Sequence, residues 1–263
     1  MESVFSSSFV SSIAGAAFGA LAAYVIARVS EIRKDRLISY RMSSNAVVLA
    51  TTCANMAMSL KSQHVQPISR ELTASQEAVE TIHANTITLG SELKGSIPAN
   101  LSSLTPLVTP IEALKNFVYT MNLSDPYAVA AVAQLEQSIL ELNAAIAMRE
   151  ALIMEHRQSG PMSRFKDLCW LLGLVQEDGT VDERYPSSVQ AMLQYTNDVI
   201  FYSVYLAEQM TTHSQLLHRN IRKLRMRVPS PHAVDFSMAR CRALIPEHLE
   251  YESWLNGMRK KAG

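Results

Sequence analysis

Residues 10–27 read VSSIAGAAFGALAAYVIA and contain no charged side chain, and the uncharged run extends back to Ser3. A helix needs about 20 mostly apolar residues to cross the roughly 30 Å hydrocarbon core of a bilayer. The run is long enough for one crossing and too short for two. It therefore predicts a single transmembrane helix over residues 10–27, so this chain must fold partly in lipid and partly in water.

The charges around this segment predict its orientation. Residues 1–9 carry only Glu2 and the terminal amine, whereas five basic residues follow the segment: Arg28, Arg33, Lys34, Arg36 and Arg41. Lys and Arg in short flanks stay on the cytoplasmic side of a membrane. We therefore expect a single-pass protein of the cell membrane, with residues 1–9 outside the cell and the chain after residue 27 in the cytoplasm.

Two other interpretations of the apolar segment stay open. A cleaved secretory signal has basic residues before a shorter apolar core, but here the basic residues come after it. A buried core helix is the other alternative, because the segment is rich in Ala, Gly and Ser and only moderately hydrophobic.

One face of the predicted span carries only small residues. They recur every four positions, and the glycines form a GxxxG motif: Ser11, Gly15, Gly19 and Ala23, continued by Ala27. Helices in lipid associate through such residues, because small side chains let two backbones approach closely. We expect a homo-oligomer formed through this face; the alternative is an Ala-rich span in which the glycines are only spacers.

The rest of the chain is predicted to be all-α. No Pro or Gly occurs between Gly19 and Pro67, so the span is expected to continue as a long helix, followed by a second helix over 68–93. Residues 28–94 hold these two helices, and residues 95–125 form a Pro-rich connector with a short helix over 111–122. Residues 229–263 form a less regular tail with one short helix within 236–245.

Residues 126–228 are predicted to form a helical bundle with two long, coiled-coil-like helices, over 126–157 and 187–227. Apolar residues follow alternating steps of three and four, interrupted by Arg149, at Val132, Leu135, Ile139, Leu142, Ile146 and Ile153. A similar register recurs at Val189, Leu193, Ile200, Ala207, Met210, Leu217, Ile221 and Leu224. Such spacing is typical of helices that pack along each other. A short apolar helix over 163–175 and a turn at Asp178-Gly179 are expected between them.

No motif in the chain predicts catalysis. GxSxG, GxxxxGK[ST], GxGxxG and HExxH are all absent from the sequence. Glu80 and His83 form one Glu-x-x-His, but a di-iron bundle needs two copies and two further Glu. His213 and His218 are five apart and diverge on a helix. We expect no enzyme activity, no metal site and no cofactor.

The three cysteines are isolated and odd in number, at Cys53, Cys169 and Cys241. No disulfide framework is expected, which agrees with a reducing cytoplasm. The chain has 24 Lys plus Arg and 24 Asp plus Glu. This balance argues against a general nucleic-acid binder, which normally has a clearly basic domain.

A local basic cluster lies near the end of the second long helix, at Arg219, Arg222, Lys223, Arg225 and Arg227. One interpretation is a solvated helix end whose cations complement the helix dipole. Another is a surface that binds anionic lipid, if this helix points back toward the membrane. The third is binding to an acidic protein, a nucleic acid or another polyanion.

These features together predict a membrane-anchored scaffold or adaptor that acts by protein binding and oligomerisation on the cytoplasmic side. The alternative is a membrane-perturbing effector of the stress or defence type, triggered through its cytoplasmic helices. A membrane-tethered enzyme is the weaker alternative, because no sequence feature favours it.

Overall fold

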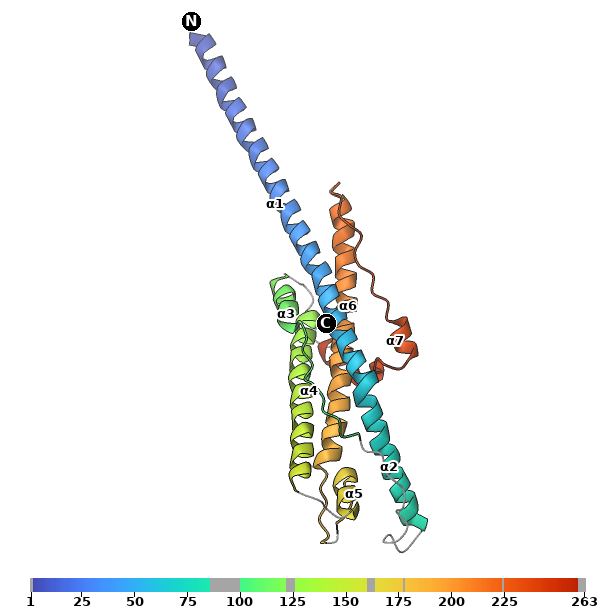
Figure 1. The fold of residues 1–263 in the computed structure, drawn as a ribbon. Coiled ribbons are helices and arrows are strands. Elements are labelled where there is room, and N and C mark those ends of the chain that lie inside the picture. The colour runs from blue at the N-terminus through green and yellow to red at the C-terminus, as the bar shows by residue number, and fades with distance from the viewer. Residues whose placement is uncertain are drawn as a thin grey trace.

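The computed structural model describes residues 2–85, 100–121, 126–159, 164–176, 178–223 and 225–259, with side chains for all except 2–10, 80–85, 164–165 and 258–259. Every regular element in these ranges is helical (Figure 1). Several predicted features lie outside the described residues: the end of the helix over 68–93, the start of the Pro-rich connector and Leu224. The side chains of Glu80 and His83 lie outside them too.

The N-terminal helix α1 (Glu2–Leu60) leaves the bundle as an isolated rod (Figure 1). Residues 11–36 are all exposed, including the apolar side chains of Phe18, Leu21 and Ile26, and from residue 11 onward Tyr40 is the first buried residue. This part of α1 is long and apolar enough to cross a membrane, and none of it is buried. It is therefore not a core helix of the bundle, which was one of the interpretations above.

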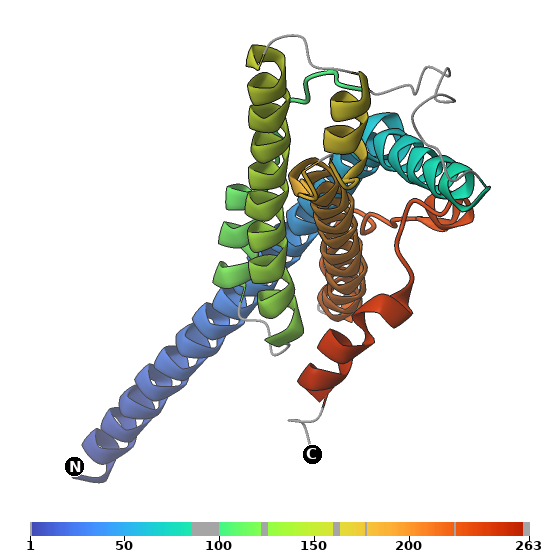
Figure 2. The same cartoon turned by 90° about the horizontal axis from the view of Figure 1, so that it is seen from below.

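The chain stays helical through Pro67, where the sequence predicts a break. Helix α1 continues into a π-helical turn, η1 (Lys61–Val65), and then into α2 (Gln66–Asn85). The N–H of Gln66 donates to the Lys61 carbonyl, five residues before it. A proline and a π-turn are both recognised causes of helix kinks, and Figure 2 shows that the chain bends sharply here.

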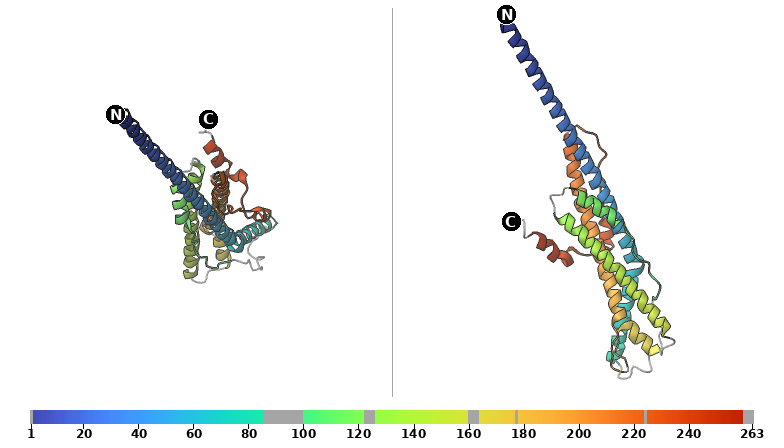
Figure 3. Two further views of the ribbon diagram at one scale, coloured as in Figure 1. Left: turned by 90° about the horizontal axis from the view of Figure 1, so that it is seen from above. Right: turned by 90° about the vertical axis from the view of Figure 1, so that its left-hand side faces the viewer.

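Helix α6 (Arg184–Lys223) is the centre of the bundle and packs along α1 on one side and α4 (Pro126–Gln158) on the other (Figure 3). The predicted seam of α4 is buried throughout, as are Val189, Ile200, Ala207, Met210 and Ile221 of α6, whereas Leu193 and Leu217 are half-buried. The predicted packing of the two long helices is thus confirmed, and α1 completes the core.

Two short helices are present where the sequence predicts them. Helix α3 (Ile111–Thr120) packs against α1 and α4, and α5 (Arg164–Leu172) packs against α6 and α2. The turn at Asp178-Gly179 is present, with Gly179 at φ 81° and an isolated bridge between Val175 and Val181.

Arg149, which interrupts the predicted seam of α4, is fully buried. Its guanidinium donates to the carbonyls of Asn100 and Ser102, at 2.6 and 2.9 Å, and to Glu150 Oε1 at 3.0 Å. It also lies 5.8 Å from the centre of the Tyr185 ring. The cation thereby holds the connector after residue 100 against the bundle.

The C-terminal tail returns along the bundle and contains three short helices: α7 (Ser237–Cys241), η2 (His248–Tyr251) and α8 (Glu252–Arg259). The buried Lys61 donates from Nζ to the Leu244 carbonyl at 2.9 Å. The ring of Tyr251 stacks on Phe201 with 3.7 Å between centroids, and its hydroxyl donates to Asp198 at 2.6 Å. The tail is thus held against α6 by the stacked rings of Tyr251 and Phe201 and by the hydrogen bond to Asp198.

Candidate functional site at the basic end of the bundle

The antiparallel packing of α1 and α6 brings two basic segments of the sequence to one end of the bundle. Ser43 Oγ donates to the Met210 carbonyl at 3.1 Å, and the hydroxyls of Ser44 and Ser214 lie 3.2 Å apart. Each further residue along α6 then lies level with an earlier residue of α1. In this register Lys223 is level with Asp35, among the basic residues that follow the apolar segment.

We define the basic end as residues 28–45 and 213–232. These segments contain ten of the chain's 24 Lys and Arg and only two of its 24 Asp and Glu, namely Glu31 and Asp35. The basic end therefore carries a net formal charge of +8 and the rest of the chain −8, although the whole chain is neutral. The charge is strongly separated along the molecule.

All ten cations are exposed: Arg28, Arg33, Lys34, Arg36, Arg41, Arg219, Arg222, Lys223, Arg225 and Arg227. Arg28 pairs with Glu31 at 2.7 Å, with both side chains 59% exposed. Such exposed pairs contribute about 0–1 kcal/mol. The cations are therefore not needed for the core and are available to an anionic ligand.

Helix α6 ends at Lys223, four residues earlier than predicted. The N–H of Arg225 donates to the Arg222 carbonyl at 3.0 Å, and that of Met226 donates to the Ile221 carbonyl at 3.4 Å. This is the Schellman pattern, in which Gly usually holds the left-handed position. Here that position belongs to Arg225, at φ 57°. A cation thus occupies the position where Gly would be less strained.

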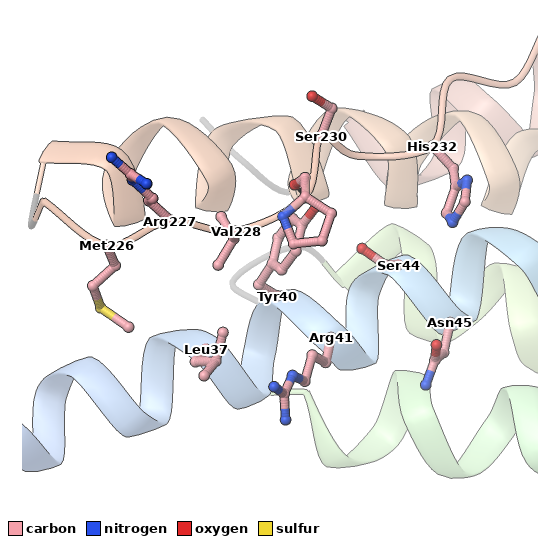
Figure 4. A pocket seen from close by; sticks show the side chains of 11 residues that line it. Leu37, Tyr40, Arg41, Ser44, Asn45, Met226, Arg227, Val228, Ser230 and His232 are labelled. Atoms are coloured by element: carbon pink, nitrogen blue, oxygen red, sulfur yellow. Dashed lines mark hydrogen bonds between the residues drawn. The ribbon is translucent and has the colours of Figure 1, made fainter.

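The segment after α6 is held on α1 by a tyrosine. Tyr40 is buried, donates from its hydroxyl to the Pro229 carbonyl at 2.7 Å, and has its ring 6.0 Å from that of His218. A cleft of about 430 Å³ lies between α1 and residues 226–232. In Figure 4, Met226 points toward α1, whereas Arg227 points away from it. The lining of the cleft combines apolar side chains with two of the ten cations, Arg41 and Arg227.

The structure thus brings together the two predicted sets of basic residues, which lie almost 200 residues apart in the sequence. The third set, Ser11, Gly15, Gly19 and Ala23, lies apart from them on the exposed part of α1. A Cβ atom added at Gly15 or Gly19 would meet nothing within 4 Å, so this face is open to a neighbouring helix. The roles of Tyr40 and Pro229 were not predicted, because their contact depends on how α6 folds back.

The basic end offers guanidinium and ammonium donors. Among the described residues, no group of three or more His, Cys, Asp or Glu side chains is placed to hold a metal ion. Arg forks bind phosphate and carboxylate oxygens bidentately, so the arrangement is suited to binding an anionic surface. We found no match to this chain among protein-family models, curated proteins or solved structures.

Proposed function

We propose that the protein is a single-pass membrane scaffold or adaptor, with its N-terminus outside the cell and its helical bundle in the cytoplasm. It acts by binding proteins and by oligomerising. The observation that carries this proposal is the continuity of α1: one helix supplies both an exposed apolar segment of membrane-spanning length and a central part of the bundle core. The span is thus joined rigidly to the bundle.

The basic end would then face the membrane. Lys223 is level with Asp35, eight residues beyond Ala27, which is roughly 12 Å along a helix. The headgroup layer extends roughly 5–7 Å beyond the hydrocarbon core. Lys223 would therefore lie within about 10 Å of the headgroups, which is the Debye length at 0.1 M salt, whereas Arg41 would lie several ångströms farther from them.

Anionic lipid is the ligand that this position favours. Each Lys or Arg near an anionic leaflet contributes about 1 kcal/mol, so the cluster can hold the bundle against the cytoplasmic leaflet. An acidic protein remains the alternative ligand of these cations. Nucleic acid is not expected, because the charge outside the basic end is net negative and would repel a long polyanion.

Oligomerisation through the face of Ser11, Gly15, Gly19 and Ala23 is the second part of the proposal. Its support is the open space around both glycines. Close approach of backbones is the main source of attraction between helices in lipid.

Two measurements test the proposal. A reporter that works only in the cytoplasm, fused after Gly263, should be active in intact cells; activity only of a reporter that works outside would overturn the orientation. Chain 28–263, which lacks none of the described buried residues, should bind vesicles that contain anionic lipid and not neutral vesicles.

Two triple variants of equal net charge distinguish binding through the basic end from general electrostatic attraction to the vesicle. Replacing Arg222, Lys223 and Arg227 by Gln should weaken vesicle binding about 100-fold, at about 1 kcal/mol per cation. The control replaces three exposed cations elsewhere, Arg70, Arg157 and Lys166, by Gln and so has the same net charge. Equal weakening by both variants would overturn the role of the basic end.

The continuity of α1 also supports a second candidate, a membrane-perturbing effector, because a rigid helix can transmit a change in the bundle to the span. Replacing residues 10–27 with an unrelated apolar helix separates the two functions. A scaffold should keep its activity after this replacement, whereas an effector that acts through its span should lose it.

A further inference from the structure

A second cleft continues the cleft at the basic end along the same face of α1. It has a volume of about 510 Å³ and lies between α1 and residues 232–239. His232 lines both clefts, and in Figure 4 it points toward α1. The α1 residues that line the two clefts include a series at steps of three and four: Leu37, Arg41, Asn45, Val48, Thr52 and Asn55. Such steps keep residues on one face of a helix, so the two clefts follow one another along α1. We call them together the long groove.

The two ends of the long groove differ in chemistry. The end nearer the apolar segment contains Arg41 and Arg227 and belongs to the basic end. Neither guanidinium forms an ion pair with another described residue. The far end is lined by no described Lys or Arg and by several apolar side chains: Val47, Val48, Met58, Val234, Phe236 and Met238. A ligand that fits both ends therefore needs an anionic head and an apolar chain.

The polar groups at the far end already have partners, whereas large apolar side chains there are uncovered. The hydroxyls of Thr51 and Thr52 donate to carbonyls four residues earlier, at 2.8 and 2.9 Å. The carboxylate of Asp235 accepts from the backbone N–H two residues later at 2.8 Å. Val48 on α1 and Met238 on α7 are 47% and 63% exposed. An apolar chain would thus cover exposed surface without leaving a polar group unpaired.

The segment that covers the long groove leaves room beneath it. Tyr40 holds the segment at Pro229, and Phe236 is buried. Every residue from 230 to 235 between these two points is exposed or half-buried. A chain can therefore lie between this segment and α1 without displacing a buried side chain from 230–235.

We infer that the long groove binds a single-chain amphiphile with an anionic head, which is a carboxylate or a phosphate. The head lies between Arg41 and Arg227, because Arg forks bind either group bidentately. Arg227 points away from α1 in Figure 4, and as an exposed side chain it changes rotamer within nanoseconds. The apolar chain runs past His232 toward Met58.

The length of the far end fits one acyl chain. Val48 and Met58 lie ten residues apart, which is roughly 15 Å along a helix. The hydrocarbon core of a bilayer is roughly 30 Å thick and holds two layers of chains, so one chain spans about 15 Å. The combined clefts also fall within the roughly 300–1,000 Å³ of small-molecule sites.

Other occupants fit the long groove less well. A two-chain lipid keeps its chains in the bilayer, and Val48 lies 21 residues beyond Ala27, roughly 30 Å along α1. A single chain binds a membrane only marginally and reversibly, so it can leave the bilayer. A peptide would bring backbone N–H and C=O groups that need partners. The inference goes beyond the proposed function, in which the cations bind the surface of the bilayer.

The test uses the full chain in nanodiscs of neutral lipid and a palmitate analogue with a diazirine at the end of its chain. Illumination attaches the analogue to the nearest residues, which mass spectrometry identifies. An analogue in the long groove should label residues 47–58 and 232–239. An analogue in the bilayer should label residues 11–27 instead, so the chain itself supplies the internal reference.

Two pairs of variants test the two ends. Val48→Trp fills the far end, and its control is Val129→Trp on α4, whose valine is 40% exposed. Arg41→Gln removes a cation of the head site, and its control is Arg70→Gln, where the arginine is also exposed. Both control variants should be labelled in the groove as strongly as the wild type.

Arg41→Gln should lower labelling of the groove about tenfold, the usual effect of losing one hydrogen bond between charged groups. Val48→Trp should remove this labelling while its helix content and the labelling of residues 11–27 stay unchanged. Labelling of the wild type confined to residues 11–27 would overturn the inference, as would groove labelling of Val48→Trp equal to that of the wild type.

Competition identifies the head. Unlabelled palmitate and lysophosphatidate are added separately, and the one that displaces the analogue at the lower concentration shows whether the site prefers a carboxylate or a phosphate. Hexadecanol, which has no charge, should not compete. Competition by hexadecanol at the same concentration, or by neither anion, would overturn the role of the cations. The vesicle variants leave Arg41 and Val48 unchanged, so the proposed function and this inference fail separately.

Discussion

Removing the buried cation of α4 should release the connector and destabilise the bundle. In Arg149→Met, a side chain of similar length fills the space but donates no hydrogen bond. The variant loses three N–H···O contacts, to the carbonyls of Asn100 and Ser102 and to the carboxylate of Glu150. The change therefore tests whether this arginine is an interruption of the seam or a structural anchor.

The expected loss follows from the surroundings of these three acceptors. Removing one partner of a buried ion pair costs about 3–5 kcal/mol when the other charge stays uncompensated. Here Glu150 is 23% exposed and still accepts from the N–H of Leu104. Ser102 is exposed, so water can bind its carbonyl. We therefore expect a loss of about 3 kcal/mol, at the low end of that range.

The assay is thermal unfolding of the full chain in detergent, followed by circular dichroism at the helix band. A loss of about 3 kcal/mol corresponds to a Tm lower by roughly 6–12 °C for a chain of this size. The control is Arg157→Met, on the same helix, whose exposed guanidinium donates once, to the Leu101 carbonyl at 3.1 Å. It should change stability by less than about 0.5 kcal/mol. Equal Tm values for the two variants would refute the anchoring role of Arg149.

Three further changes have defined outcomes. Burial raises the pKa of the Asp198 carboxyl above its usual 3.8, so the contribution of this group to stability should fall as pH rises through the raised pKa. Asp198→Asn, which still accepts from Tyr251, should be more stable than the wild type at pH 7 in thermal unfolding, and the difference should vanish in acid. Arg225→Gly should raise the free energy of unfolding by about 0.5–1 kcal/mol, because Gly adopts positive φ without strain; a lower stability would contradict the strained cap. Gly19→Leu should reduce association of the isolated span in a membrane two-hybrid assay, and unchanged association would leave that glycine as a spacer.

The helices could be predicted from the sequence because their signals are local. The apolar spacing from Val132 to Ile153 and the proline at the start of α4 are signals formed by residues that lie close together in the sequence. The anchoring role of Arg149 could not be predicted, since its two carbonyl acceptors lie more than 45 residues away in a connector without periodicity. The same holds for the contact between Tyr251 and Asp198.

The two sets of cations at the candidate site were predicted, but their proximity was not. The cations after the apolar segment and those near the end of α6 were identified separately, each from its own local charge. Their meeting depends on the direction of α6 relative to α1, which is determined by packing in the core and by the contacts of Ser43 and Ser44. The outward face of α4 has apolar residues at the same kind of spacing as the buried seam, from Leu140 to Met154, so only burial distinguishes the two faces.

The continuity of α1 has a mechanical consequence. From Ala27 to Leu60 the helix extends roughly 50 Å, so if it crosses a bilayer it acts as a lever with its pivot at the membrane surface. Spans tilt to match the thickness of the hydrocarbon core, and a tilt of about 10° would displace Leu60 sideways by roughly 9 Å. A membrane a few ångströms thinner would thus displace the end of the bundle farthest from the membrane by almost the width of a helix. Fluorescence energy transfer from a dye near the kink at Lys61 to a labelled lipid surface should change with acyl-chain length, and a constant signal would show that the lever is not rigid.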